Sequence, residues 1–377
     1  MYVHFPWCVR KCPYCDFNSH VKPEFFTETR YLESLLNDLN QELPQVKQRQ
    51  VESIFLGGGT PGLFSGTGID FLLANIRSML ELKPDLEITL ETNPNSADAA
   101  NFTKYRKFGI NRISIGAQSF ARENLTTLGR MHTAEDIYNA VKLAKKTGFD
   151  NINLDLMFGL PGQTRETALV DLQQAIELNP QHISWYQLTI EPNTSFFHSP
   201  PILPDADDVY KIQNAGIKLL TEHGYNQYEV SAFSRDNFVC RHNLNYWQFG
   251  DYIGIGAGAH SKLSFFAADK VLRYNKNKNP DSFMQATNSL KHIQNKRLLT
   301  KADLTFEFML NALRLKAGFS PELFCQRTGG ILIKTIESYL KTAQDLSLLQ
   351  VSKSWIKPSK LGYDFLNDLI NVFAIEK

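Results

Sequence analysis

The chain has 377 residues, 43% hydrophobic and 21% charged, proportions that are ordinary for a soluble globular protein and allow two or three domains. Lys and Arg number 40 against 39 Asp and Glu, and a net charge of +1 excludes a strong field for nucleic acid or anionic lipid. No apolar run approaches the ~18 residues of a spanning helix, and no signal-peptide pattern opens the chain. We therefore expect a cytoplasmic protein that associates with membranes at most peripherally and has no nucleic-acid partner.

Short apolar or β-branched runs alternate with helical patterns over the first two-thirds of the chain. Between two such runs, residues 133–148 show apolar positions three and four apart, with Thr133 as N-cap and Gly148 just past the helix end. This alternation predicts right-handed crossovers and a parallel sheet, arranged as a closed or partial barrel or as a doubly wound sheet. Both arrangements place their chemistry at the carboxyl ends of the strands. The predicted strands are residues 2–5, 53–60, 86–92, 112–118, 152–159 and 183–190.

The composition changes twice after the sixth predicted strand. Residues 191–208 are proline-rich and predict an extended loop that could close over a ligand, and residues 273–282 are polar and turn-rich. From about Leu299 the pattern predicts helices with one hairpin-like piece at 348–359, similar to a small winged-helix module. Because this module lacks a strong basic face, we interpret it as structural or substrate-covering. The expected divisions are 1–235, 236–298 and 299–377.

Three of the five cysteines lie close together near the N-terminus. Cys8, Cys12 and Cys15 have the spacing C-x3-C-x2-C, and Asp16 stands where a fourth ligand would be sought. The cluster does not indicate a disulfide framework and fits a reducing compartment. A structural zinc site needs four ligands. It would have to recruit a distant side chain from among His4, His20, Cys240 and Cys325.

A [4Fe–4S] cluster is the second interpretation of these cysteines. Three thiolates leave one iron of the cube with open coordination positions, which is what a cluster requires to bind a substrate. The run "FLGGGTP" at 55–61 ends the second predicted strand, and its glycines allow a backbone to approach a charged ligand group closely. A glycine-rich turn alone is a weak signal. Together with the cysteine spacing it favours the iron–sulfur cluster over zinc.

These motifs resemble the radical S-adenosylmethionine superfamily. The stretches "YVHFPWCVRKCPYCDF", "GGGTP", "LETNP", "SIGAQSF" and "DLMFGLPGQT" together resemble its coproporphyrinogen III oxidase-like group, and in particular the heme chaperone branch called HemW. The resemblance covers essentially the whole chain from Tyr2 onward. It implies an α/β fold, a partial (β/α)6 TIM-like barrel, with a small, mainly α, winged-helix-like C-terminal domain. It also implies a [4Fe–4S] cluster whose unique iron chelates S-adenosylmethionine.

The resemblance assigns roles residue by residue. Cys8, Cys12 and Cys15 would ligate the cluster, and Arg130 could grip the methionyl carboxylate with two parallel bonds. Each assignment has an alternative: Glu91 could be a loop acid, Asp155 could cap a turn, and Arg130, in the helical stretch 123–132, could be merely solvated. The residues implied for S-adenosylmethionine are Tyr2, Tyr14, Gly58, Gly59, Thr60, Glu91, Gln118, Arg130, Asp155, Thr189 and His260.

The stretch "CRHNLNYW" at 240–247 matches the HNxxYW motif of the heme chaperones. A neutral His242 imidazole could take an axial position on heme iron, Tyr246 and Trp247 could offer flat surfaces, and Cys240 is a possible thiolate ligand. The alternative is a hydrogen-bonded core histidine with packing aromatics. The motif could instead brace residues 254–261, whose glycines and His260 would line the nucleoside site. Cys325 is expected to be a small buried apolar residue.

Two functions of different class fit the resemblance. One is the binding of heme and its transfer to apo-hemoproteins such as respiratory-chain components. Such a chaperone would be a monomer or a homodimer, and an electron donor would reduce its cluster. The other is oxygen-independent decarboxylation of coproporphyrinogen III. The decarboxylases show Cys-Gly-Cys where this chain has Cys15-Asp16-Phe17, and they carry an extension before the first strand. With the HNxxYW motif, these differences favour a heme chaperone with three cofactors, [4Fe–4S], S-adenosylmethionine and heme. These differences do not indicate whether the protein cleaves S-adenosylmethionine.

Overall fold

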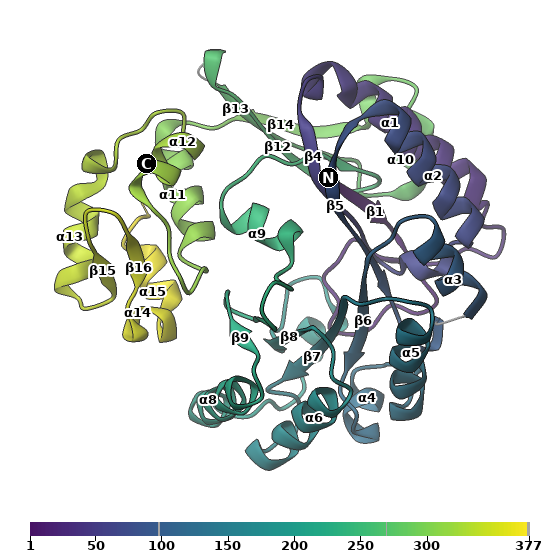
Figure 1. Cartoon of the computed structure of the whole chain (residues 1–377), viewed down its shortest axis with the longest axis horizontal. Coiled ribbons are helices and arrows are strands. Elements are labelled where there is room, and N and C mark those ends of the chain that lie inside the picture. Colours follow the sequence, from purple (N-terminus) through teal and green to yellow (C-terminus); the bar gives the residue numbers. More distant parts are fainter. Residues whose placement is uncertain (97–98, 269, 375–377) are drawn as a thin grey trace.

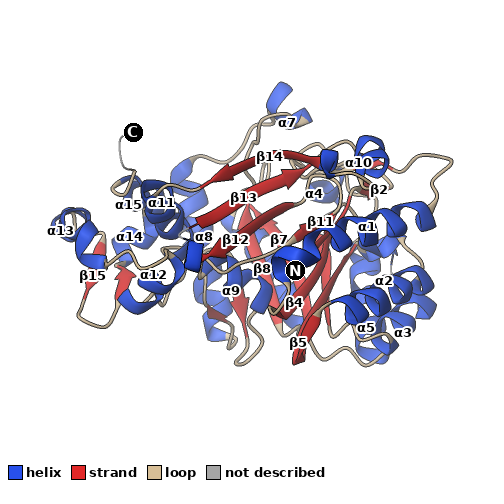
Figure 2. Cartoon of the chain, turned by 90° about the horizontal axis from the view of Figure 1, so that it is seen from above, coloured by secondary structure: helices blue, strands red, loops and turns tan. Residues whose placement is uncertain are grey.

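The computed structural model describes residues 1–96, 99–268 and 270–374 (Figures 1 and 2). Its main sheet has the strand order β11-β1-β4-β5-β6-β7-β8-β10-β9. The bounds in that order are Gly254–Ile255, Tyr2–Phe5, Gln50–Gly58, Glu81–Thr92, Arg112–Gln118, Ile152–Phe158, His182–Gln187, Ala232–Ser234 and Asn226–Gln227.

Six strands of this sheet, β1, β4, β5, β6, β7 and β8, are parallel neighbours, as the sequence predicts. The edge strands β11 and β9 do not pair with each other in the described part of the chain, so the barrel is open. Helices lie along its outer side (Figure 1). Their bounds are α1 Glu28–Val46, α2 Gly66–Met79, α3 Ala99–Lys107, α4 Arg122–Thr127, α5 Ala134–Lys146, α6 Arg165–Glu177 and α8 Ala206–Glu222.

The outer helix α5 begins and ends at the residues that the sequence indicates. The hydroxyl of Thr133 accepts a hydrogen bond from the backbone nitrogen of Asp136, and the Asp136 carboxylate closes the capping box in return. Gly148 follows the helix with a φ of 88°, a conformation that glycine adopts without strain. The predicted helix at 133–148 is therefore confirmed as α5.

A second, antiparallel sheet was missed by the sequence analysis. Its strands are β12 His260–Phe265, β13 Lys270–Lys276 and β14 Ile293–Leu298, and α10 covers Pro280–Ala286. The prediction of turns at 273–282 was wrong because polar side chains of this segment are buried against partners on α1. Lys276 Nζ lies 2.6 Å from the carboxylate of Asp38, and both side chains are fully buried. Lys276 also pairs with Glu42, to which Tyr274 donates a hydrogen bond.

The C-terminal part forms a separate apolar core of helices and one hairpin, as predicted. Figure 1 shows it beside the barrel, with α9 (Arg241–Trp247) between the two. Helix α9 contacts both β4 and α11. The loop expected at 191–208 also contains a short helix, α7 (Ser195–His198). The C-terminal elements are α11 Lys301–Ala312, α12 Pro321–Arg327, α13 Glu337–Asp345, β15 Leu349–Val351, β16 Ile356–Pro358, α14 Lys360–Asp364 and α15 Leu366–Asn371.

Within residues 1–96, 99–268 and 270–374, no helix combines the length and the apolar character that a bilayer crossing requires.

Candidate cluster and cofactor site

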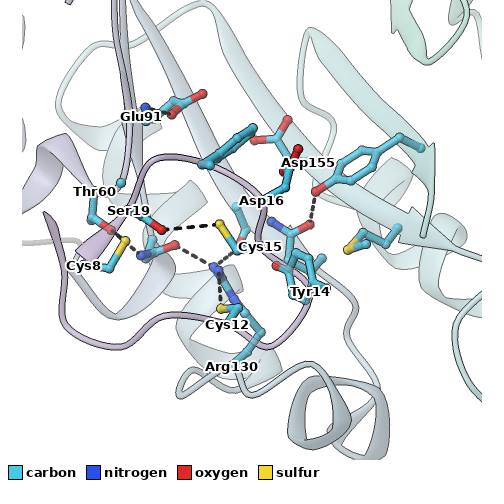
Figure 3. Close-up of a pocket in the computed structure, with 18 of the residues that line it drawn as sticks. Cys8, Cys12, Tyr14, Cys15, Asp16, Ser19, Thr60, Glu91, Arg130 and Asp155 are labelled. Atoms are coloured by element: carbon cyan, nitrogen blue, oxygen red, sulfur yellow. Dashed lines mark hydrogen bonds between the residues drawn. The ribbon is translucent and has the colours of Figure 1, made fainter. Parts of the chain in front are cut away.

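The three clustered cysteines lie on one loop at the carboxyl end of β1. The short strands β2 (Trp7–Cys8) and β3 (His20–Val21) pair in parallel and close this loop at its base. The thiols of Cys8, Cys12 and Cys15 are free and partly exposed, and all three line one cavity of about 400 Å³ (Figure 3). We call this space the first cavity. The loop therefore gathers the thiols where the sequence spacing predicts, beside the carboxyl ends of the parallel strands.

Two of the thiols have a hydroxyl group nearby. The Cys8 sulfur accepts a hydrogen bond from the Thr60 hydroxyl at 3.5 Å, and the Cys15 sulfur lies 3.6 Å from the Ser19 hydroxyl. Burial raises the pKa of the Cys8 and Cys15 thiols. Ligation by a metal centre would deprotonate them, since the thiolate is the ligand form of cysteine. The donor set of three soft sulfurs on one wall fits an iron–sulfur cluster.

The zinc interpretation finds no matching geometry. Within residues 1–96, 99–268 and 270–374, no three His, Cys, Asp or Glu side chains are grouped so that they could hold one metal ion. Three of the four candidate fourth ligands contact other groups. His4 bonds to the Asn18 carbonyl at 2.8 Å, His20 lies 3.3 Å from the Asn18 side chain, and Cys240 lies against Glu87. The fourth candidate, Cys325, is on α12 of the C-terminal part.

The glycine run at the end of β4 brings backbone against the base of the cysteine loop. Gly58 has a φ of 109°, and a Cβ there would lie 2.4 Å from the His4 ring. A Cβ on Gly59 would lie 2.5 Å from the Trp7 carbonyl oxygen. Both distances are shorter than any real side-chain contact, so only glycine fits these positions. Gly58, Gly59 and Thr60 all line the first cavity.

Two carboxylates line this cavity from β5 and β7, which lie on either side of β6. Glu91, near the end of β5, accepts a hydrogen bond from the Gly58 nitrogen at 3.0 Å. Burial, together with the nearby Asp155, raises the pKa of Glu91 to about 8. Asp155 accepts bonds from Ser114 at 2.9 Å and Asn153 at 2.8 Å. It lies in the middle of β7, so the alternative that it caps a turn was wrong.

Arg130 lies in the loop after α4, outside the helix in which the sequence analysis placed it. Its guanidinium donates to the Asn93 side chain at 2.6 Å and the Gly116 carbonyl at 2.7 Å, and its other terminal nitrogen is 3.7 Å from the Cys12 sulfur. Burial alone would lower the Arg130 pKa, but the nearby Tyr14 and Cys12 raise it overall. Arg130 is therefore a fixed cation beside the cysteine loop. Asn93, which the motif "LETNP" contains, was not singled out by the sequence analysis.

Three further predicted residues also line the first cavity. Gln118 has a φ of 65°, which is strained for a residue with a side chain, and its amide oxygen accepts a hydrogen bond from the Tyr186 hydroxyl at 2.7 Å. Tyr14 is half-buried on the cysteine loop, and burial raises its pKa. Thr189 is exposed at the edge of the cavity, just past β8.

A second cavity of about 530 Å³ adjoins the first. Gly58, Glu91 and Asp155 line both, so the two spaces share a wall. Tyr2 and His260, which the resemblance assigned to S-adenosylmethionine, line this second cavity and not the first.

His242 and Tyr246, the first and fifth residues of the HNxxYW motif, also line the second cavity. His242 Nδ1 lies 3.1 Å from the Ser53 hydroxyl, while its buried Nε2 has no hydrogen-bond partner among the described residues. The ring stacks on Phe55 with centroids 4.9 Å apart and meets the edge of Tyr246 at 4.9 Å. Burial lowers the pKa of His242 well below its usual value, so the imidazole is neutral.

Two other residues of this stretch lie outside both cavities. Cys240 is fully buried beside Glu87, and burial raises the pKa of its thiol to about 12. Trp247 packs under the guanidinium of Arg314, 4.8 Å from the ring centroid, on the side of the C-terminal part. Cys325, expected to be buried, is partly exposed.

Comparisons with known proteins show the family of this chain. Residues 2–175 match the model of the Radical SAM superfamily. The chain is 46% identical to the heme chaperone HemW of Escherichia coli strain K12, covering all of this chain and 98% of that protein. It is 31% identical to HemW of Bacillus subtilis strain 168, again over all of this chain and 99% of that protein.

Among solved structures, the coproporphyrinogen III oxidase HemN of Escherichia coli superposes with a TM-score of 0.84 at 23% identity, over 99% of this chain and 89% of the other. At that identity the match shows the shared fold, an open parallel barrel with a C-terminal helical part. The full-length identities show the relationship more finely: this chain belongs to the radical SAM superfamily and, within it, to the HemW family.

Proposed function

We propose that this protein is a heme chaperone that binds heme in the second cavity and transfers it to apo-hemoproteins in the cytoplasm. The observation that carries the proposal is the neutral, buried His242, whose Nε2 lacks a partner among the described residues while the residue lines an aromatic-walled cavity. A neutral imidazole is a common axial ligand of heme iron. The names of the full-length relatives support the same function.

The residues around His242 prepare it as a ligand. If Nε2 is to present a lone pair to iron, the ring proton must reside on Nδ1, where the Ser53 hydroxyl at 3.1 Å can accept it. Phe55 and Tyr246 hold the ring from two sides. Tyr252 extends the aromatic wall, meeting Tyr246 at 4.6 Å between centroids. These rings offer flat apolar surface to a porphyrin.

We further propose that Cys8, Cys12 and Cys15 hold a [4Fe–4S] cluster and that the first cavity binds S-adenosylmethionine. When bound, such a cluster supplies the electron for reductive cleavage of that cofactor. Arg130 is placed to bind the methionyl carboxylate, and Glu91 with the Gly58 backbone to bind the ammonium group. Since the two cavities share a wall, we propose that occupancy of the first influences heme binding or release in the second.

The test of the proposal is a heme titration of the anaerobically reconstituted protein. We expect a Soret shift that reports a stable complex, strongly reduced in His242→Ala and unchanged in His223→Ala, whose histidine is exposed at the end of α8. The protein is then offered coproporphyrinogen III with S-adenosylmethionine and a reductant. Carbon dioxide release at a catalytic rate, with no stable heme complex, would replace the chaperone by the decarboxylase.

A further inference from the structure

The second cavity is lined by a buried cation that the proposed function does not use. Arg112 is the first residue of β6, and its side chain reaches the cavity although only 2% of the residue is exposed. An arginine in such a position normally has its five N–H donors satisfied by the protein. Its surroundings therefore decide whether it is a structural counter-ion or a ligand-binding group.

The guanidinium of Arg112 has no protein partner within the described part of the chain. No hydrogen bond or ion pair involves its side chain, and its Nε is buried without a partner. Burial alone would lower the Arg112 pKa, but the nearby Cys240 and Glu87 raise it overall, so the group is charged. Burial of a guanidinium without hydrogen-bond partners is costly, because its N–H donors stay unsatisfied.

Two nearby carboxylates, Glu87 and Asp155, accept hydrogen bonds from other groups. Glu87 accepts hydrogen bonds from the backbone nitrogens of Arg241 and His242, both at 3.1 Å. Asp155 accepts bonds from Ser114 and Asn153. Both carboxylates act on Arg112 through their charge without forming an ion pair within 4 Å. Its N–H donors therefore remain available to a ligand in the cavity.

The other residues that line the second cavity indicate what kind of anionic ligand would pair with Arg112. Tyr2, Phe55, Tyr246 and Tyr252 line the cavity with aromatic rings, and its volume of about 530 Å³ lies in the range of small-molecule sites. A flat apolar ligand that carries a carboxylate would fill the aromatic part and pair with the buried cation. Arginine binds carboxylates with two parallel hydrogen bonds, which fixes orientation as well as affinity.

We propose that Arg112 binds a carboxylate of the ligand in the second cavity, and that this carboxylate is a propionate of heme. The identity of the ligand rests on the proposed function. Arg112 and His242 would then hold the same molecule at two points, the iron by the imidazole and the edge by the guanidinium. This would orient the porphyrin relative to the wall shared with the first cavity.

The test compares heme with its dimethyl ester, in which both propionates are neutral. We expect the wild type to bind heme about tenfold to hundredfold more tightly than the ester, as charge-assisted hydrogen bonds imply. Arg112→Met should bind heme as weakly as the ester and leave ester binding unchanged. Arg112→Lys, which keeps the charge but loses the paired geometry, should fall between. Arg241→Met is the matched control, because that guanidinium pairs with the exposed Asp85 outside the cavity.

The outcomes separate this inference from the proposed function. Equal binding of heme and ester by the wild type, or undiminished discrimination in Arg112→Met, would overturn the role of Arg112 while heme binding itself stands. A wild type that binds neither compound would contradict the proposed function instead. Circular dichroism checks that the variants fold. If Arg112→Met does not fold, full wild-type discrimination in Arg112→Lys overturns the inference and reduced discrimination supports it.

Discussion

The carboxylate of Glu87 lies 3.1 Å from the backbone nitrogen of His242, although the two residues are 155 positions apart in the sequence. The same carboxylate accepts a bond from the Arg241 nitrogen and lies 3.7 Å from the Cys240 sulfur. Glu87 therefore satisfies the free N–H groups at the start of α9 and fixes the rotation of that helix over β5. The position of the candidate heme ligand depends on this buried acid.

We expect Glu87→Gln to destabilise the protein by about 1–3 kcal/mol, because an amide replaces a carboxylate that accepts backbone hydrogen bonds. Heme binding should weaken as well, since α9 loses its anchor. Urea unfolding and a heme titration measure the two effects. Asp85→Asn, which removes only the exposed partner of Arg241, is the control. A Glu87→Gln protein with wild-type heme affinity would show that α9 is positioned by other contacts.

Ser53→Ala removes the group that meets His242 Nδ1 at 3.1 Å. Without it the imidazole proton is no longer held on Nδ1, and Nε2 is a poorer ligand. We expect about a tenfold loss of heme affinity, the usual size of an effect that acts through a ligand's hydrogen-bond partner. The Soret position of the complex should shift too. Ser53→Thr, which keeps a hydroxyl, should retain the wild-type spectrum, and a wild-type spectrum in Ser53→Ala would remove Ser53 from the site.

Replacement of any one of Cys8, Cys12 and Cys15 by alanine should abolish the iron–sulfur cluster. The reconstituted wild type should contain about four iron atoms per chain and be coloured, because these three thiolates are the ligands that the site provides. Iron analysis and visible absorption measure the loss. Cys325→Ala should keep the full iron content, since Cys325 is on α12 in the C-terminal part. A cluster that survives the loss of one loop cysteine would call for a different set of ligands.

Glu91 gives the cofactor-free protein a pH-dependent stability. Its pKa is raised from 4.5 to about 8 by burial and by Asp155. Between these values the folded protein holds a proton on Glu91 that the unfolded chain has lost. The Glu91 contribution to the free energy of unfolding therefore falls as pH rises from about 5 to about 8, by at most about 1.4 kcal/mol per pH unit.

Urea unfolding of the cofactor-free wild type and of Glu91→Gln at several pH values tests this relation. The wild type should lose stability relative to the variant as pH rises through this range, because the glutamine has no proton to release. Parallel curves for the two proteins would mean that Glu91 is ionised throughout.

Lys276→Met should cost about 3–5 kcal/mol of stability, because it leaves the buried carboxylates of Asp38 and Glu42 without their cation. Lys83→Met, which breaks only the exposed pair with Glu52, should cost less than about 1 kcal/mol. Thermal or urea unfolding compares the two. Equal effects would show that the buried network does not hold the second sheet to α1.

The sequence predicted correctly those helices and strands that are indicated by residues close together in the chain. The capping box of Thr133 and the apolar runs of the parallel strands involve residues a few positions apart, so backbone geometry converts them directly into structure. The second sheet was missed because β13 carries Lys276 and Asn275 inward. Such residues indicate a surface turn unless their buried partners on α1 are known.

The sequence by itself determined the cysteine loop, the glycine run and the family. Cys8, Cys12 and Cys15 lie within eight positions, and so short a segment keeps them close to one another. Only the tertiary structure decided which cavity each remaining residue faces. It showed that Tyr2 and His242 line the same cavity and that the buried Arg112 there has no hydrogen-bond partner for its Nε. The sequence could not show this, because burial and pairing depend on strands that are far apart in the chain.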